Sequence, residues 1–533
     1  MSNRAAALYR QAACVPAKTA VFFEGDAWSF ARLLERAQAY AAGLADAGFG
    51  RGDKLGLMLA TRPEFIALEY AAYILGGTLV PLNVHYLGHE IEHALGTCAV
   101  EFLVLDGAFA GRLAPDLRAR CPALRGVFVF SDAQAGSLPS SSPSWLQEAG
   151  LLLGEAAAAP QPVELQGDDV PMMLYTSATT GKAKGVMLTI GNLESNYDAT
   201  PDWLHLAHDE VILCALPFYN TFALNQCINT VVQLGATLVL LPRFDALACL
   251  QAIEQHRCTF FPAVPTMLQK VLHHPDVARY DLSSLRRLCV GAAPVPAPLL
   301  ARLHERVGKG ALVITGYGLT EATAMVSTHE VTMDDAGELR RAKSIGRPIS
   351  GIDMAILDAA GAPVAFDTVG EICVRGPNVM KGYYNLPEAT AEAIVDGWLR
   401  TGDLGTMDAQ GYFMIVDRKK DLIIRGGQNI YPADIEEALY RHPAVAEAAV
   451  IALPDDVLGE VPKGFVALKP GSVVSPAELI AHCKAELAYF KVPVAVDILA
   501  ELPKGPTGKI LRRALRTDLG SLAPTHPLKE TTP

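Results

Sequence analysis

The stretch "LYTSATTGKAKGVMLT", Leu174 to Thr189, places hydroxyl groups, two glycines and two lysines between two apolar runs. Such a loop can offer backbone N–H groups and hydroxyls to a phosphate, while a nearby lysine supplies positive charge. Serine, threonine and glycine also dominate ordinary turns, so composition alone favours a flexible polar turn. The chain contains no GxxxxGK followed by Ser or Thr, which argues against a P-loop NTPase.

Three further segments carry residues that could do chemistry. The basic string "KGPTGKILRR" contains Lys509, and by itself it is typical of an exposed tail. The charged string "DRKKD", Asp417 to Asp421, is typical of a solvated turn. The segment "ALPFYNTFAL" places aromatic side chains around Asn220, where they could form an apolar binding wall or simply part of a sheet core.

The elements that would position these residues follow a βα pattern. Residues 18–130 alternate amphipathic helical stretches such as "FARLLERAQAYAAGLADAG" with short apolar runs, and a second such series begins at Met172. This predicts an α/β fold: a large N-terminal domain of stacked βα subdomains with parallel sheets. From Ile352 the pattern changes to short strands and turns, which predicts a small β-barrel or sheet. After Asp421 a compact stretch predicts a small α+β C-terminal domain.

The composition narrows the classes of function. A chain of 533 residues predicts at least two domains. No apolar run reaches the roughly 18 residues of a membrane helix, and no secretory signal is recognisable, so we expect a cytoplasmic protein without a transmembrane segment. A net charge of -12 without a basic block argues against nucleic acid as a partner. The ten cysteines show no metal spacing and are expected to be reduced core residues.

The loop string resembles the phosphate loop of the acyl-activating (adenylate-forming, AMP-binding) superfamily, acid:CoA ligase branch, whose usual form is YTSGTTGxPKG. The resemblance covers nearly the whole chain, because further motifs of that family follow in the same order: "GAAP" at Gly291, "GYGLTE" at Gly316 to Glu321, "GRP" at Gly346, "TGDLG" at Thr401 to Gly405, "DRKKDLIIRGGQNIYPADIE" at Asp417 to Glu436, and "PTGKI" at Pro506 to Ile510.

The resemblance implies a two-step reaction with ATP, Mg²⁺ and coenzyme A. A small-molecule carboxylic acid and MgATP would give acyl-adenylate and pyrophosphate, and the CoA thiol would then displace AMP. Glu321 would bind the metal and Thr320 would contact the α-phosphate, while Asp403 and Arg418 would hold the ribose. The resemblance assigns the other ATP-binding positions to the phosphate loop and the adenine site: Thr176, Ser177, Ala178, Thr179, Thr180, Gly181, Lys184, Ala292, Gly316, Tyr317 and Gly318.

The resemblance makes Lys509 the candidate catalytic residue, together with Thr320 and Glu321. Attack of a carboxylate on the α-phosphorus brings anions together, so a point cation near the attacking and bridging oxygens lowers the barrier. Lys509 is also expected to contact ATP.

The resemblance also divides the chain. It implies an adenylation domain at 1–418, a hinge at 419–420 with Lys420 as the hinge residue, and a mobile lid domain at 421–520. Residues 521–533 are expected to be disordered. In the family the lid rotates after adenylation, withdraws the lysine and presents a loop that lines the pantetheine tunnel. Here that loop would contain Arg425, Gly426 and Gly427.

Three positions depart from the family pattern. Ala178 replaces a usual glycine, which costs about 1 kcal/mol or more if the loop needs positive φ there. Ala183 replaces a usual proline and should loosen the turn before Lys184. Asn220 replaces a histidine that borders the acyl pocket in many acyl-CoA ligases. An amide cannot take a positive charge, so any gating role of that histidine must be met differently.

The predicted acyl pocket is mostly apolar and suits a fatty or aromatic acid. It would be lined by Phe218, Asn220, Phe222, Ala263, Gly291 and Gly316. No aspartate occurs in "LPFYNTFALNQ" to pair a substrate ammonium, which argues against an amino-acid activator.

Three alternatives remain open at this point: an acyl-adenylate transferase that loads a carrier protein, a catalytically impaired homologue that only binds nucleotide or acyl ligand, and a luciferase-like oxygenase. A homodimer is also compatible with the sequence.

Overall fold

The computed structural model describes residues 3–131, 143–155, 160–176, 183–293, 295–307, 310–333, 339–341, 343–426, 428–504 and 510–517. The chain separates into two compact units. Unit 1 comprises Met1–Ala355, Cys373–Thr401 and Gln410–Phe413, and unit 2 comprises Ile356–Ile372, Gly402–Ala409 and Met414–Pro533. The sequence-based boundary at residue 418 and the hinge at 419–420 stay predictions.

Unit 1 contains a first sheet, sheet A, with the strand order β21-β9-β8-β4-β3-β5-β6-β7. All its pairs from β8 to β7 are parallel, whereas β9 is antiparallel to both β8 and β21. The predicted βα pattern is therefore confirmed here, with one antiparallel edge. The strands are β3 (Lys54–Met58), β4 (Thr78–Pro81), β5 (Phe102–Asp106), β6 (Gly126–Phe130), β7 (Leu146–Glu148), β8 (Met172–Tyr175), β9 (Gly185–Leu188) and β21 (Gly382–Tyr383).

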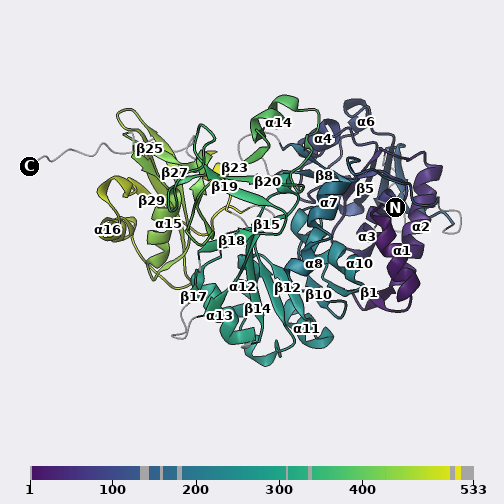
Figure 1. Cartoon of the computed structure of the whole chain (residues 1–533), viewed down its shortest axis with the longest axis horizontal. Coiled ribbons are helices and arrows are strands. Elements are labelled where there is room, and N and C mark those ends of the chain that lie inside the picture. The colour runs from purple at the N-terminus through teal and green to yellow at the C-terminus, as the bar shows by residue number, and fades with distance from the viewer. Residues whose placement is uncertain are drawn as a thin grey trace, which may run out of the picture. The chain divides into compact units, whose positions relative to one another are not determined.

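The helices of this region cover the sheet as the sequence pattern predicts. Helix α2 (Phe30–Asp46) begins at Ser29, whose hydroxyl accepts a hydrogen bond from the backbone N–H of Arg32 at 3.2 Å. It packs on α3 (Pro63–Ile74), and Figure 1 shows both helices beside α1 (Ala5–Cys14). Strand β3 is buried along its whole length, as expected for a parallel strand covered on both faces.

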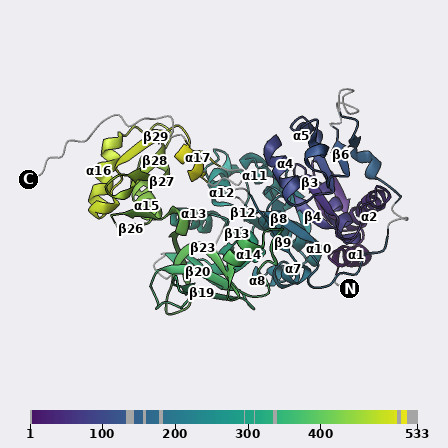
Figure 2. The ribbon, with the colours of Figure 1, turned by 90° about the horizontal axis from the view of Figure 1, so that it is seen from above.

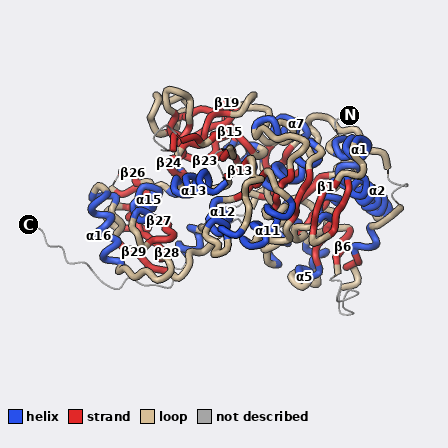
Figure 3. Tube along the Cα trace, turned by 90° about the horizontal axis from the view of Figure 1, so that it is seen from below, coloured by secondary structure: helices blue, strands red, loops and turns tan. Residues whose placement is uncertain are grey.

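A second sheet of unit 1, sheet B, has the order β18-β15-β14-β13-β12-β10-β11-β1-β2. Helices α11 (Ala246–His256), α12 (Pro265–Leu272) and α13 (Ala297–Val307) pack one against the next along it (Figure 3). The strands are β1 (Thr19–Phe23), β2 (Asp26–Ser29), β10 (Val211–Cys214), β11 (Thr237–Leu240), β12 (Phe260–Ala263), β13 (Arg287–Val290), β14 (Leu312–Gly318), β15 (Met325–Glu330) and β18 (Ser344–Pro348).

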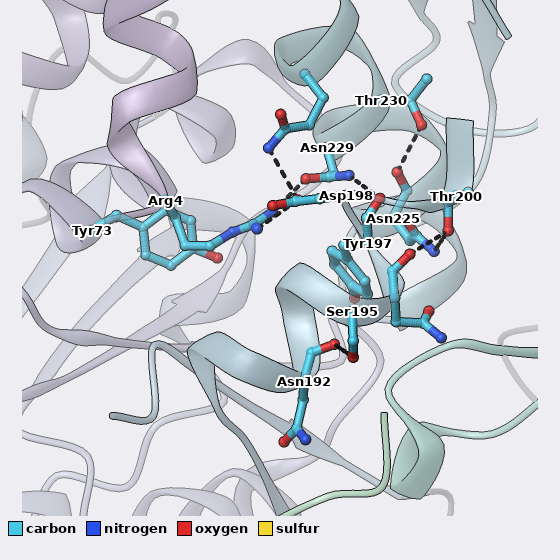
Figure 4. Close-up of polar contacts among 12 residues, drawn as sticks. Arg4, Tyr73, Asn192, Ser195, Tyr197, Asp198, Thr200, Asn225, Asn229 and Thr230 are labelled. Carbon is cyan, nitrogen blue, oxygen red and sulfur yellow. Dashed lines mark hydrogen bonds and ion pairs between the residues drawn. The ribbon is translucent and has the colours of Figure 1, made fainter. Parts of the chain in front are cut away.

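A buried polar network anchors the N-terminal segment to the middle of unit 1 (Figure 4). The Arg4 guanidinium pairs with Asp198 at 2.6 Å and also donates to Asn229. Asn229 in turn donates to the carbonyl of Tyr197 at 2.7 Å, and Gln233 donates to Asp198 at 3.0 Å. Because the buried guanidinium of Arg4 is paired with Asp198 and Asn229, the cost of burying Arg4 is offset and the first helix is held in place.

Unit 2 contains a small α+β body. Strand β28 (Gly459–Leu468) is hydrogen-bonded to β27 (Val445–Asp455), β25 (Ile423–Arg425) and β29 (Ala495–Leu499). Helices α15 (Pro432–Arg441) and α16 (Pro476–Glu486) pack against β27 and β29, as Figure 2 shows. Their apolar residues form one buried core that includes Ile435, Leu439, Val450, Val466 and Leu479. Strand β26 (Gln428–Ile430) and helix α17 (Arg512–Thr517) complete this body.

The short strands predicted after Ile352 are β19 (Asp353–Leu357), β20 (Gly370–Arg375), β23 (Trp398–Met407) and β24 (Phe413–Arg418), which are hydrogen-bonded neighbours in that order. Among the described residues β19 pairs with no strand but β20, so these strands form an open sheet rather than a barrel.

Two further expectations concern the whole chain. All the cysteines except Cys14 are buried, which confirms that these nine are core residues, and their reduced state stays a prediction. In the part of the chain that the structure describes, no helix is long and apolar enough to span a bilayer.

Candidate active site

The two ends of the predicted phosphate loop meet in unit 1. Thr176 directly follows β8 and Lys184 directly precedes β9, and the N–H of Thr176 donates to the carbonyl of Lys184 at 3.1 Å. His93, on α4 (Gly88–Thr97), lies 3.1 Å through Nε2 from the carbonyl of Ala183. The antiparallel pair therefore holds the loop base closed. The remaining loop positions, Ser177, Ala178, Thr179, Thr180 and Gly181, lie outside the described residues.

One tyrosine connects the loop base to the predicted metal ligand. The Nζ of Lys184 lies 4.6 Å from the centre of the Tyr383 ring, a cation–π arrangement. The Tyr383 hydroxyl donates to Oε1 of Glu321 at 3.0 Å. Burial, and then the Glu321 charge, raise the pKa of Tyr383 well above its ordinary value, so its hydroxyl keeps its proton. Tyr383 lies outside the sequence motifs that predict the site.

A tight turn presents Thr320 and Glu321. It is a single 3₁₀ turn, Thr320–Ala322, that follows β14. The N–H of Met380 donates to the carbonyl of Glu321 at 2.9 Å, and Nδ2 of the buried Asn378 donates to the carbonyl of Ala322 at 3.1 Å. The hydroxyl of Thr323, whose φ is 70°, donates a hydrogen bond to the carbonyl of Asn378 at 2.6 Å. The residues after Gly376 thus fix the orientation of this turn.

The carboxyl ends of β12, β13 and β14 bring together four of the predicted acyl-pocket residues. The N–H of Gly291 donates to the carbonyl of Ala263 at 3.3 Å. A Cβ added at Gly291 would lie 3.9 Å from the carbonyl oxygen of Gly316 and 4.0 Å from the ring of Phe222, so a larger side chain would project between them. Phe218 is buried, with its ring centre 5.1 Å from that of Phe65. This end of the sheet is where ligands bind in open α/β folds.

Two glycines around Tyr317 are required by the neighbouring strand. A Cβ at Gly316 would lie 2.7 Å from the carbonyl oxygen of Ser327, and a Cβ at Gly318 only 1.7 Å from that of Ala324. Any larger residue would push β15 away from β14. Tyr317 itself is 9% exposed, and Ala292 has φ of 65°, a conformation that alanine rarely adopts. The predicted contacts of these residues with adenine stay predictions.

Asn220 has a local structural role. It is the N-cap of α9 (Thr221–Ala223), and its Oδ1 accepts a hydrogen bond from the N–H of Ala223 at 3.1 Å. Asparagine is among the best N-cap residues. A π-helical segment, Leu224–Asn229, follows directly. Asn220 therefore has a structural role as the N-cap of α9, independent of any effect on the acid substrate.

In unit 2 the two predicted ribose residues contact each other. Asp403 lies on β23 and Arg418 ends β24, and their Oδ1 and Nε atoms are 3.0 Å apart. Asp403 is 5% exposed, whereas the Arg418 side chain is 45% exposed. The adjacent Asp417 accepts hydrogen bonds from the N–H groups of Arg418 and Ala433 at 2.7 and 2.9 Å. Burial raises the pKa of Asp417 despite these bonds.

Lys420, the predicted hinge residue, is half-buried, and its buried Nζ has no hydrogen-bond partner among the described residues. The charged groups that act on it are Arg418, Asp421, Asp403 and Arg516. Both oxygens of Asp421 are already bound, one by Arg512 and one by Arg516, each at 3.0 Å. Burial, and then the Arg418 charge, lower the pKa of Lys420 to about 8.

We expect Lys420→Met to raise the melting temperature at neutral pH and to remove part of its pH dependence. The pKa of Lys420 falls from 10.5 in the unfolded chain to about 8 in the folded one. Between these values the unfolded chain binds more protons, so stability rises with pH across this window. Removing about 1 kcal/mol of the cost of burying this charge would raise the melting temperature by roughly 2–4 °C. Melting curves are recorded from neutral pH to about pH 10 for Lys420→Met and for the control Lys469→Met. The control replaces an exposed lysine of unit 2. An unchanged pH dependence would contradict the assignment.

The predicted CoA-tunnel loop is described only in part. The guanidinium of Arg425 donates to the carbonyl of Phe490 at 2.8 Å. Gly426 has φ of 56°, and its N–H donates to the carbonyl of Leu458 at 2.7 Å. A left-handed backbone explains a glycine at this position. Gly427 and Lys509 lie outside the described residues.

A separate cavity of about 260 Å³ lies at the amino ends of β3, β4 and β8, away from the carboxyl ends that gather the predicted residues. None of the residues that line it is a predicted site residue: Arg51, Gly52, Lys54, Gly76, Thr78, Leu165, Asp169, Val170, Pro171, Met173, Met187 and Tyr384.

Comparison with known proteins matches the chain to two family descriptions. Residues 8–384 match "AMP-binding enzyme" and residues 434–509 match "AMP-binding enzyme C-terminal domain". A long-chain-fatty-acid–CoA ligase from Bacillus subtilis (strain 168) is 36% identical over 529 residues, covering 95% of this chain and 92% of that protein. A feruloyl-CoA synthase from Amycolatopsis sp. is 38% identical over 515 residues, covering 96% and 98%.

Solved structures agree over the same length. ATP-bound MatB from Rhodopseudomonas palustris has a TM-score of 0.84 at 29% identity, covering 97% of this chain and 98% of that one. The o-succinylbenzoate CoA synthetase MenE from Bacillus subtilis, in complex with ATP and magnesium ion, has a TM-score of 0.81 at 31% identity, covering 96% and 99%. The chain belongs to the family of AMP-binding enzymes and to its acid:CoA ligase branch.

Proposed function

We propose that this protein is an ATP-dependent acid:CoA ligase that activates a fatty or aromatic carboxylic acid through an acyl-adenylate. The observation that carries the proposal is the connection of Lys184 and Glu321 through Tyr383 within unit 1. This connection supports the proposal because it joins the cation predicted to bind phosphate to the carboxylate predicted to bind the metal. Relatives named for long-chain fatty acids and for feruloyl and succinylbenzoate substrates support this class of acid.

In the first step an oxygen of the carboxylate attacks the α-phosphorus of ATP, and the bond to the bridging oxygen breaks to release pyrophosphate. Thr176 and Lys184 would hold the β- and γ-phosphates, and Thr320 would orient the α-phosphate. Carboxylate oxygen is the ligand type that Mg²⁺ prefers, so Glu321 fits this ion. Bound Mg²⁺ would neutralise phosphate charge. Lys509 would stabilise the charge that builds on the α-phosphate oxygens.

In the second step the CoA thiol sulfur attacks the acyl carbon, the bond from that carbon to the AMP oxygen breaks, and the thiol proton passes to solvent. AMP therefore leaves with one oxygen of the original acid. Arg425, Gly426 and Gly427 would line the path of the pantetheine arm. A glycine pair there allows the backbone to approach the arm closely.

The test is product identification across a panel of short, medium, long and aromatic acids. Each acid is incubated with MgATP and either CoA or a phosphopantetheinylated carrier protein, and the thioester is identified by mass spectrometry. Thioester on CoA supports the proposal and names the substrate. Thioester on the carrier alone would favour the carrier-loading alternative, and ATP binding without any thioester would favour a binding protein. Light emission with oxygen would identify an oxygenase.

We expect Asp403→Asn to weaken ATP binding by about 10–100-fold, because a charged acceptor of the ribose hydroxyls is lost. Calorimetric titration with ATP measures the effect. Asp353→Asn is the matched control, since Asp353 pairs with Arg375 at 2.9 Å on neighbouring strands but is exposed. An unchanged affinity in the Asp403 variant would contradict the ribose assignment.

The relatives do not bear on assembly or cellular location. A homodimer and a cytoplasmic location therefore stay predictions from the sequence.

A further inference from the structure

Tyr383, the last residue of β21, and the following Tyr384 have different surroundings. Tyr383 is 9% exposed and contacts both Lys184 and Glu321. Tyr384 has its ring 5.4 Å from the Nζ of Lys54 and lines the separate cavity. Only the first tyrosine therefore reaches the candidate active site, and the second provides a natural control.

The backbone of Tyr383 is held rigidly. It pairs with Val186 of β9, and its N–H donates to the hydroxyl of Thr390 at 2.9 Å. The preceding Gly382 has φ of 142°, and a Cβ there would lie 2.7 Å from Cγ2 of Thr390. Thr390 belongs to α14 (Pro387–Ala393), so a helix and a strand together fix the direction of the Tyr383 side chain.

The two ends of the Tyr383 side chain contact groups of opposite charge. The ring face attracts the ammonium of Lys184, and the hydroxyl donates to the carboxylate of Glu321. A hydrogen bond to an ionised carboxylate is stronger than a neutral one and restricts the rotation of the acceptor.

We propose that Tyr383 is a positioning residue of the adenylation step: its hydroxyl orients Glu321 toward Mg²⁺ and its ring seats Lys184 toward the phosphates. This inference rests on the proposed function, since it takes Glu321 as the metal ligand. Tyr383 contacts no substrate in this account and acts only through these two side chains.

The test is the Mg²⁺ dependence of acid-dependent ATP–pyrophosphate exchange in Tyr383→Phe. This change keeps the ring and removes the hydroxyl. The Mg²⁺ concentration for half-maximal rate should rise about tenfold or more, as expected for loss of one hydrogen bond to a charged group. The rate at saturating Mg²⁺ and the melting temperature should stay near the wild-type values.

Tyr383→Leu removes the ring as well, so it should weaken ATP binding in addition to shifting the Mg²⁺ requirement. Tyr384→Phe, the neighbouring control, should change neither. Wild-type Mg²⁺ dependence in Tyr383→Phe would overturn the proposal, as would a loss of rate that saturating Mg²⁺ does not recover. Absence of exchange in the wild type would count against the proposed function instead. In that case the Mg²⁺ dependence of ATP binding, compared between wild type and Tyr383→Phe, decides the role of Tyr383 by itself.

Discussion

Replacement of Lys509 by alanine is expected to slow acyl-adenylate formation by about 10²–10³-fold, the usual cost of removing one group that stabilises transition-state charge. The same change should leave thioester formation from supplied acyl-adenylate largely intact. The difference arises because only the first step builds charge on the α-phosphate during attack by an anion. Pyrophosphate release measures the first half-reaction, and CoA thioester formed from synthetic acyl-adenylate measures the second.

Lys504→Ala is the matched control for this prediction. Lys504 lies in the same basic segment, but its Nζ pairs with Glu447 at 2.5 Å, so its charge is already engaged. It should leave both half-reactions close to wild type. An equal loss of both half-reactions in the Lys509 variant would contradict a role specific to adenylation.

Glu321→Gln should have the second large effect, a fall of about 10²-fold in the adenylation rate at ordinary Mg²⁺ concentrations. The amide can still accept the hydrogen bond from Tyr383, so the turn should keep its shape, but it supplies no negative charge to the metal. The second half-reaction requires no new phosphate charge and should be less affected. Pyrophosphate exchange over a range of Mg²⁺ concentrations measures the change.

Glu330→Gln is the control for the loss of a carboxylate, because Glu330, at the end of β15, is exposed and its Oε1 lies 2.8 Å from Nε2 of His205. It should leave exchange unchanged. If Glu321→Gln keeps the wild-type rate and Mg²⁺ dependence, the metal site must be assigned to other residues.

Much of the fold could be predicted from apolar periodicity. The helical repeat before Gly48 predicts α2, and the run "KLGLM" predicts β3, because a buried parallel strand is apolar throughout. Periodicity does not reveal which distant strands pair. Val21 of β1 pairs with Leu238 of β11, more than two hundred residues later in the chain. Because periodicity does not reveal strand pairing, the sequence could not decide between a barrel and an open sheet for the strands after Ile352.

The residues of the candidate site also fall into two groups, those that the sequence predicts and those that it does not. Ordered motifs identify the residues that would touch ATP, such as Lys184 and Glu321, because their chemistry dictates their type. Tyr383 and Asn378 act through other residues, and their importance arises only when β21 pairs with β9 and the loop before β21 meets the 3₁₀ turn. Asn220 could have been identified as an N-cap, since asparagine before a short helical stretch is a known signal.

The most direct test of the proposed acyl-adenylate route follows one oxygen atom of the acid. The enzyme is incubated with MgATP, CoA and a carboxylic acid labelled with oxygen-18 in its carboxylate, and the products are examined by mass spectrometry. Attack of the carboxylate on the α-phosphorus predicts that one labelled oxygen appears in AMP and none in pyrophosphate. Unlabelled AMP, or label in inorganic phosphate, would contradict an acyl-adenylate route and with it the function proposed for this protein.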